Sequence, residues 1–128
     1  MASRIFLDAN IILEVIGKRK YQELAKQIIT DNEGSVFISA LSAHLIVYFG
    51  SKFYDLDRIH DLLLGFEILP LTFDDISWAF ANRRDSDFED AMQISVAIRN
   101  GCDQLITLDK SLVQKYAGLS SIEVVQLA

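Results

Sequence analysis

Ile5-Phe6-Leu7-Asp8-Ala9-Asn10-Ile11-Ile12-Leu13 is the stretch that decides the fold of this 128-residue chain. Its first three residues are apolar and predict a short buried strand, which ends at Asp8. The apolar pattern from Asn10 to Ile16 predicts a helix directly after that strand. A strand that leads at once into a helix is typical of proteins whose sheet is parallel and covered by helices.

The same alternation of short apolar runs and helical patterns continues to the end of the chain. Further strands are expected at 36–38, 67–70, 104–107 and 122–125, and Pro70 indicates that the 67–70 strand either lies at an edge or ends there. Helices are expected at 21–29, 41–49, 56–64, 74–82, 86–99 and 110–116, the one at 86–99 opened by the capping-box sequence Ser86-Asp87-Phe88-Glu89. The pattern predicts a single α/β domain over residues 1–128, a three-layer α/β/α sandwich with a small parallel sheet.

Composition and charge exclude several classes of protein. A hydrophobic content of 51% with 23% charged residues argues against a disordered chain. The net charge of −6 argues against a protein that holds nucleic acid by a bulk positive field. A single cysteine, Cys102, excludes an intramolecular disulfide framework and a cysteine-based zinc finger. With no apolar run of membrane-spanning length, we expect a cytoplasmic protein without membrane contact.

Four acids lie where the predicted strands and helices meet. Asp8 and Asp109 each follow a strand, whereas Asp87 and Asp90 share one face at the start of a helix. In a parallel sheet these side chains converge at one edge. Two carboxylates about 4 Å apart repel by about 4 kcal/mol at an effective dielectric constant of 20, so such a cluster must protonate, spread apart or bind cations. Oxygen ligands suit Mg²⁺ or Mn²⁺, and a paired-metal site can support phosphodiester cleavage.

Three segments of the chain resemble the recurring acidic motifs of PIN-domain nucleases. They are Phe6-Leu7-Asp8-Ala9-Asn10-Ile11-Ile12-Leu13, Asp87-Phe88-Glu89-Asp90-Ala91 and Leu105-Ile106-Thr107-Leu108-Asp109. Their order, spacing and the chain length are similar to those of VapC-like ribonuclease toxins. The resemblance implies a Mg²⁺- or Mn²⁺-dependent endoribonuclease that leaves 5′-phosphate and 3′-hydroxyl ends. It also implies an RNA substrate, an antitoxin partner and a homodimer.

The resemblance carries over to individual residues. It implies catalytic roles for Asp8, Asp90 and Asp109. The same three acids and Asp87 would bind metal, while Asn10 and Thr107 would support Asp8 and Asp109, so that the implied set is Asp8, Asn10, Asp87, Asp90, Thr107 and Asp109.

His44 departs from the family pattern. The family usually has a glutamate in the helix after the second strand, where this chain has His44. Imidazole suits Mn²⁺ better than Mg²⁺, so the substitution can change metal preference or reduce activity. Glu14 is a poor substitute, because six helical residues place it about 9 Å along the axis from Asp8. A histidine in an apolar helix is, alternatively, a hydrogen-bonded structural residue.

The other candidate residues also have structural interpretations. Asp109, and either Asp8 or Asn10, stand where helix N-caps are expected. Asp87 and Glu89 are acids of a first helical turn, which the helix dipole favours, and Glu89 is expected to be a capping-box partner. Arg83-Arg84 precedes the Asp87/Asp90 motif and is interpreted either as a phosphate-binding pair or as a solvated loop.

Two further functions compete with the nuclease. A haloacid-dehalogenase-like phosphatase also has an acid after its first strand, but it needs a second acid where Asn10 stands. A PIN-fold module that binds RNA or protein without cleaving is the other alternative, and His44 is the residue that keeps it open.

Overall fold

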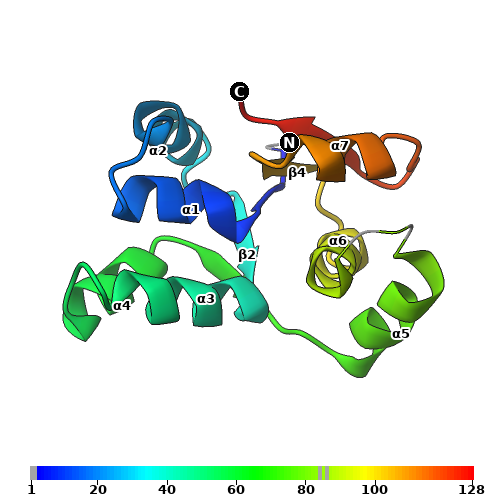
Figure 1. Cartoon of the computed structure of the whole chain (residues 1–128), viewed down its shortest axis with the longest axis horizontal. Helices are drawn as coiled ribbons and strands as arrows, with labels where there is room; N and C mark the ends of the chain where they lie inside the picture. Colours follow the sequence, from blue (N-terminus) through cyan, green and yellow to red (C-terminus); the bar gives the residue numbers. More distant parts are fainter. Residues whose placement is uncertain (1–2, 84, 86) are drawn as a thin grey trace.

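A computed structural model describes residues 3–83, 85 and 87–128 of the chain. Five parallel strands form one sheet in the order β3-β2-β1-β4-β5 (Figure 1). They are β1 (Ile5–Leu7), β2 (Val36–Ser39), β3 (Glu67–Leu69), β4 (Gln104–Thr107) and β5 (Glu123–Gln126). The predicted parallel sheet is confirmed, β3 lies at an edge and ends just before Pro70, and the last strand is shifted by one residue from its predicted bounds.

Helices cover both faces of the sheet, which confirms the three-layer sandwich. In Figure 1 the first four helices lie to the left of the sheet and the last three to the right. The left group is α1 (Ala9–Ile16), α2 (Gln22–Asp31), α3 (Ala40–Gly50) and α4 (Leu56–Leu63); the right group is α5 (Phe73–Asn82), α6 (Phe88–Arg99) and α7 (Lys110–Tyr116). Within the described residues, no helix is long and apolar enough to cross a membrane.

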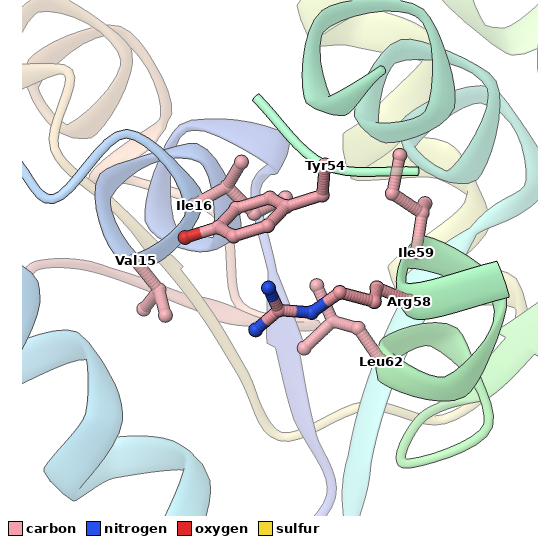
Figure 2. A pocket seen from close by; sticks show the side chains of 6 residues that line it. All are labelled: Val15, Ile16, Tyr54, Arg58, Ile59 and Leu62. Carbon is pink, nitrogen blue, oxygen red and sulfur yellow. The ribbon is translucent and has the colours of Figure 1, made fainter. Parts of the chain in front are cut away.

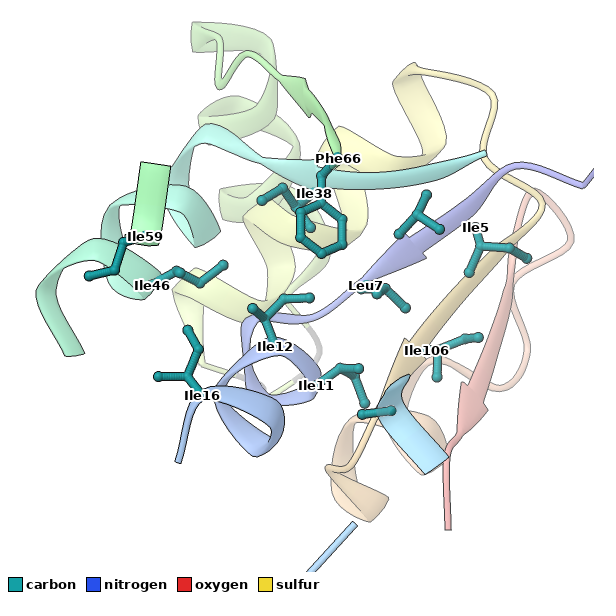
Figure 3. Close-up of a cluster of buried hydrophobic side chains, with 12 residues drawn as sticks. Ile5, Leu7, Ile11, Ile12, Ile16, Ile38, Ile46, Ile59, Phe66 and Ile106 are labelled. Atoms are coloured by element: carbon teal, nitrogen blue, oxygen red, sulfur yellow. The ribbon is translucent and has the colours of Figure 1, made fainter. Parts of the chain in front are cut away.

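The alternation of side chains along the strands builds two separate cores. Ile5 and Leu7 of β1 pack with the helices that follow β1 and β2, as Figure 3 shows, whereas Phe6 packs on the other face with α6 and α7. Successive residues of a strand point to opposite faces, so a run of apolar residues is needed when both faces are covered. The sheet is thus fixed from both sides, and its strand ends are held in a constant register.

The start of α6 differs from the sequence prediction. The helix begins at Phe88, and its N-cap is Asp87, whose carboxylate accepts a hydrogen bond from the Glu89 backbone N–H at 3.1 Å. Ser86, expected to open a capping box, lies outside the described residues. Glu89 stands one position too early to be a capping-box partner of Asp87, and its predicted pairing with Ser86 stays a prediction.

A buried ion pair fixes α5 against the C-terminal end of α6. Asp75 is completely buried, and its carboxylate accepts hydrogen bonds from the Arg99 guanidinium at 2.9 and 3.1 Å and from the Ser95 hydroxyl at 2.8 Å. Burial on its own raises the pKa of Asp75, but the hydrogen bonds from Arg99, Thr72 and Ser95 outweigh it, and the pKa is lowered. This acid is a neutralised structural group.

Candidate active site

The carboxyl ends of β1 and β4 place Asp8 beside Thr107. Leu7 pairs with Ile106 in the sheet, so the next residue of each strand leaves the sheet at the same level. The Thr107 hydroxyl donates a hydrogen bond to the Asp8 carboxylate at 2.9 Å. Asp8 is 8% exposed and Thr107 is fully buried. The strand pairing therefore orients an acid that is almost completely removed from water.

Asn10 completes the support of Asp8 from the first turn of α1. Its amide Nδ2 donates to the Asp8 carboxylate at 3.3 Å and to the Thr107 hydroxyl at 3.1 Å. Its Oδ1 accepts the Leu108 backbone N–H at 3.2 Å. The amide thus links the first strand end to the loop after β4. In this arrangement Asn10 orients the Asp8 carboxylate, and its supporting role in an active site stays a prediction.

The first turns of α6 bring further acids towards Asp8. Burial, followed by the charges of Asp8, Asp87, Asp109 and Glu89, raises the pKa of Asp90 to about 7. Such a shift requires the acids to lie close enough for mutual repulsion in a partly dry environment. The causes of this shift indicate that Asp8, Asp109 and the acids of α6 influence the charge of Asp90, which is half-buried.

The pKa of Asp8 is also raised by burial and by a neighbouring acid. Burial is the largest effect on its carboxyl group and raises the pKa of Asp8, and the charge of Asp109 adds to it. The hydrogen bond from Thr107 acts in the opposite direction without cancelling the rise. Among the described residues, no lysine, arginine or histidine forms an ion pair with Asp8 or Asp90. Perturbed carboxylates without a cationic partner are typical of functional sites.

Asp109 and Asp87 have a second role at helix N-termini. The Asp109 Oδ1 accepts backbone N–H groups from Ser111 at 2.9 Å and Leu112 at 3.3 Å, so it caps α7. The Asp109 N–H in turn donates to the Thr107 hydroxyl at 3.0 Å. The cap of α7 uses only the Oδ1 of Asp109, and the Asp87 cap of α6 accepts a backbone N–H at one oxygen, so capping does not prevent either acid from also binding a cation. The structural and the functional interpretation of these two acids are therefore compatible.

Glu89 is the acid that the sequence interpretation missed. Burial raises the pKa of Glu89, and the charges of Asp87 and Asp8 contribute to the rise. Its side chain therefore belongs to the electrostatic cluster around Asp8 and Asp90. A glutamate in a first helical turn has an ordinary explanation in the helix dipole, which is why its sequence position alone did not identify it.

The chemistry of this cluster suits a hard divalent cation. In the part of the chain that the structure describes, no three His, Cys, Asp or Glu side chains are grouped closely enough to hold a metal ion together. Mutual repulsion between carboxylates favours such a spread arrangement. The donors are oxygen atoms, and three of the acids, Asp8, Glu89 and Asp90, have raised pKa values. Mg²⁺ and Mn²⁺ prefer oxygen ligands and complete their coordination with water. The residues present fit such an ion.

His44 takes no part in the hydrogen bonds around Asp8. His44 is exposed on α3, and within the described residues its side chain forms no hydrogen bond or ion pair, so the hydrogen-bonded structural role predicted for it was wrong. Arg83 is the exposed C-cap of α5, and its carbonyl accepts the Tyr116 hydroxyl at 2.9 Å. Arg84 lies outside the described residues.

An apolar pocket lies elsewhere on the molecule, between α1 and α4. Its volume is about 150 Å³. Figure 2 shows the Tyr54 ring and the Arg58 guanidinium extending across it, with the guanidinium carbon 4.6 Å from the ring centroid. The other lining residues are Val15, Ile16, Ile59 and Leu62. None of the clustered acids lines this pocket, so it is separate from the candidate active site.

Comparison with known structures shows the same fold in toxins. The chain resembles a toxin–antitoxin complex from Klebsiella pneumoniae with a TM-score of 0.79 and 21% identity, over 97% of this chain and 98% of that one. It resembles VapC20 of Mycobacterium tuberculosis, described as a toxin that cleaves the sarcin–ricin loop, with a TM-score of 0.72 and 15% identity, over 93% and 98% of the two chains. VapBC2 of Rickettsia felis, bound to a promoter DNA fragment, gives 0.66 and 16% over 95% and 97%.

Sequence comparison gives the family. A search of curated protein sequences finds no match. The family model of the PIN domain matches residues 5–118, which include Asp8, the acids of α6 and Asp109. The three acidic segments, the five-stranded parallel sheet and the family match agree, and the chain belongs to the PIN domain family.

Proposed function

We propose that this protein is a metal-dependent endoribonuclease that hydrolyses RNA phosphodiester bonds, and that it is the toxin of a toxin–antitoxin pair. The observation that supports this most directly is the pairing of Asp8 with Asp90. They come from two distant segments, both have raised pKa values, and neither has a cationic partner among the described residues. PIN-family membership and the likeness to VapC toxins support the same assignment.

In the proposed mechanism, each side chain of the site binds the cation, orients a neighbouring carboxylate or positions the attacking water. Asp8, Asp90 and Asp109, with Asp87, would bind Mg²⁺ or Mn²⁺. When bound, the cation supplies positive charge to the phosphate and its leaving oxygen. Thr107 and Asn10 keep the Asp8 carboxylate in one orientation. Asp90, at the rim of the buried centre, accepts a hydrogen bond from the attacking water and directs it at phosphorus. The products carry 5′-phosphate and 3′-hydroxyl ends.

The partners are part of the proposal. Several structures of this fold are complexes of a VapC-type chain with its antitoxin, which supports an antitoxin partner here. A homodimer is supported by large side chains exposed on α3 and α5, among them Tyr48 at 58%, Phe73 at 77% and Phe80 at 69%. Apolar surface of this extent is typical of protein interfaces. Light scattering after size exclusion would measure the oligomeric state.

The test is cleavage of a mixed-sequence single-stranded RNA with Mg²⁺ or Mn²⁺. The control is the double variant Asp8→Asn/Asp90→Asn, which keeps the size of both side chains. We expect cleavage that requires the metal and is absent in the control. A folded parent protein that cleaves nothing with either metal, but binds RNA, would instead support the non-cleaving module, with His44 as the residue to change first.

A further inference from the structure

A buried polar network lies one helical turn from Asp90. Gln93 on α6 is 2% exposed. Its Oε1 accepts the Ser39 hydroxyl at 2.6 Å, and its Nε2 donates to the Ser42 hydroxyl oxygen at 2.7 Å. Ser39 and Ser42 are both completely buried. Three polar side chains in such a place are costly unless all are hydrogen-bonded, as they are here.

The network reaches the strand end beside Asp8. Ser39 is the last residue of β2 and the N-cap of α3, where its Oγ accepts the Ser42 N–H at 2.9 Å. In the pairing of β1 with β2, Phe6 stands opposite Phe37. Continued by two residues, this register places Asp8, just after β1, at the level of Ser39, which is still paired with Leu69 of β3. Gln93 therefore connects the helix that carries Asp90 to the strand end next to Asp8.

This connection opposes a force that acts on α6. Negative charges on Asp8 and Asp90 would repel each other, and that repulsion would act to separate the first turns of the helix from the strand ends. Apolar packing tolerates a small slide of one element over another, since it has little directionality. The hydrogen bonds of Gln93, at 2.6 and 2.7 Å, do not tolerate such a slide, because hydrogen bonds weaken steeply with distance and angle.

We propose that Gln93, through Ser39 and Ser42, is a positioning residue that fixes the separation of the Asp8 and Asp90 carboxylates for a divalent cation. The inference rests on the proposed metal-dependent nuclease, and it assigns Gln93 no contact with the substrate. Removing the network lowers metal affinity and turnover without changing how tightly RNA is held.

Ser95 provides a matched control on the same helix. It is 6% exposed, two residues after Gln93, and its hydroxyl donates to Asp75 at 2.8 Å on the face towards α5. Ser95→Ala removes a buried hydrogen bond from α6, as Gln93→Met does, but it leaves the link to β2 intact. Both substitutions lower stability, so stability alone does not distinguish them.

The experiment measures Mn²⁺ affinity, urea unfolding, and kcat and KM for RNA cleavage in the parent and both variants. Free Mn²⁺ is counted by electron paramagnetic resonance, which does not depend on activity. We expect Gln93→Met to weaken Mn²⁺ binding about tenfold and to lower kcat to a similar extent with KM unchanged. Ser95→Ala keeps the Mn²⁺ affinity within about twofold of the parent. Ser42→Ala, which removes one acceptor, gives a smaller change in the direction of Gln93→Met and serves if Gln93→Met does not fold.

Equal Mn²⁺ affinity in Gln93→Met, Ser42→Ala and the parent would overturn the positioning role and leave the nuclease standing. A folded parent protein that neither binds Mn²⁺ nor cleaves RNA would overturn both. The two failures are thereby distinguished.

Discussion

At the N-terminal end of α6 Asp90 faces other acids, whereas at the C-terminal end Arg99 neutralises the buried Asp75. The two positions are nine residues, or about 14 Å, apart on one helix. Asp75 has a lowered pKa and three side chains that donate hydrogen bonds to it. Asp90 has a pKa raised to about 7 by burial and by four neighbouring acids. At one end of α6 the Asp75 carboxylate is neutralised and contributes to stability. At the other end the charge of Asp90 is repelled by its neighbours, and binding a proton or a cation would remove that repulsion.

The strongest test of this difference is to remove the charge at each end. We expect Asp90→Asn to lower RNA cleavage at least about 1000-fold, since a metal site loses a carboxylate ligand. The free energy of unfolding does not fall, because the substitution removes repulsion. Single-turnover cleavage and urea unfolding measure the two effects. An Asp90→Asn protein with parental activity would show that the cluster is not catalytic.

At the C-terminal end of α6 we expect substitutions to lower stability and to leave RNA cleavage unchanged. Arg99→Met leaves Asp75 buried without its cation, and we expect the free energy of unfolding to fall by about 3 kcal/mol. Asp75→Asn costs less, because Arg99 is 31% exposed and can be solvated. Cleavage per folded molecule stays close to that of the parent. A large loss of activity in folded Arg99→Met would contradict the separation of the two ends.

We expect a divalent metal ion to stabilise the protein through the acids at the N-terminal end of α6 and not through Asp75. A ligand that binds only the folded state at 100 times its dissociation constant stabilises by about 2.7 kcal/mol. We expect Mn²⁺ to raise the melting temperature of the parent and of Asp75→Asn, but not that of Asp8→Asn/Asp90→Asn. Differential scanning calorimetry at pH 8, with and without Mn²⁺, measures this. An equal rise in the double variant would place the ion away from the acids.

The two acids also predict opposite pH dependence in metal-free protein. The pKa of Asp90 is raised from 3.8 to about 7, so between these values the folded state binds the extra proton and stability falls as the pH rises. The pKa of Asp75 is lowered, so its contribution is present above pH 3.8 and is lost as the pH falls through the lowered value.

We therefore expect Asp90→Asn to gain roughly 1–2 kcal/mol over the parent at pH 8 after allowance for solvent screening, and little at pH 4. Urea unfolding in EDTA across this range measures the difference. A constant difference between pH 4 and pH 8 would mean that Asp90 does not titrate in this window.

The sequence predicted the elements better than it predicted their contacts. The strands were recognisable because each is a short apolar run, and Asp8 and Asp109 because they follow strands. The Asp75–Arg99 pair was not, since its partners are 24 residues apart and meet only through the crossing of α5 and α6. Gln93 was missed for the same reason. Its partners lie more than 50 residues away, at the end of β2.

His44 shows how an apolar neighbourhood misleads. The buried positions of α3 are Ser42, Ile46 and Gly50, each four residues from the next. They form one face, and His44, two residues from its neighbours in this series, lies on the opposite side. Its apolar neighbours in the sequence therefore did not indicate burial.

The smallest expected effect is that of His44→Glu. The side chain is exposed and has no partner among the described residues, so the substitution leaves stability unchanged. The substitution would add a sixth acid, near the start of α3, to Asp90 and the four acids around it. The negative potential there would increase, whereas the neutralised Asp75 at the other end of α6 would be unaffected. We expect up to about tenfold tighter Mg²⁺ binding, measured by titration calorimetry. His44→Gln is the control for the loss of imidazole. If His44→Gln tightens Mg²⁺ binding as much as His44→Glu, the new charge is not the cause, and His44 acts on the site by occupying space.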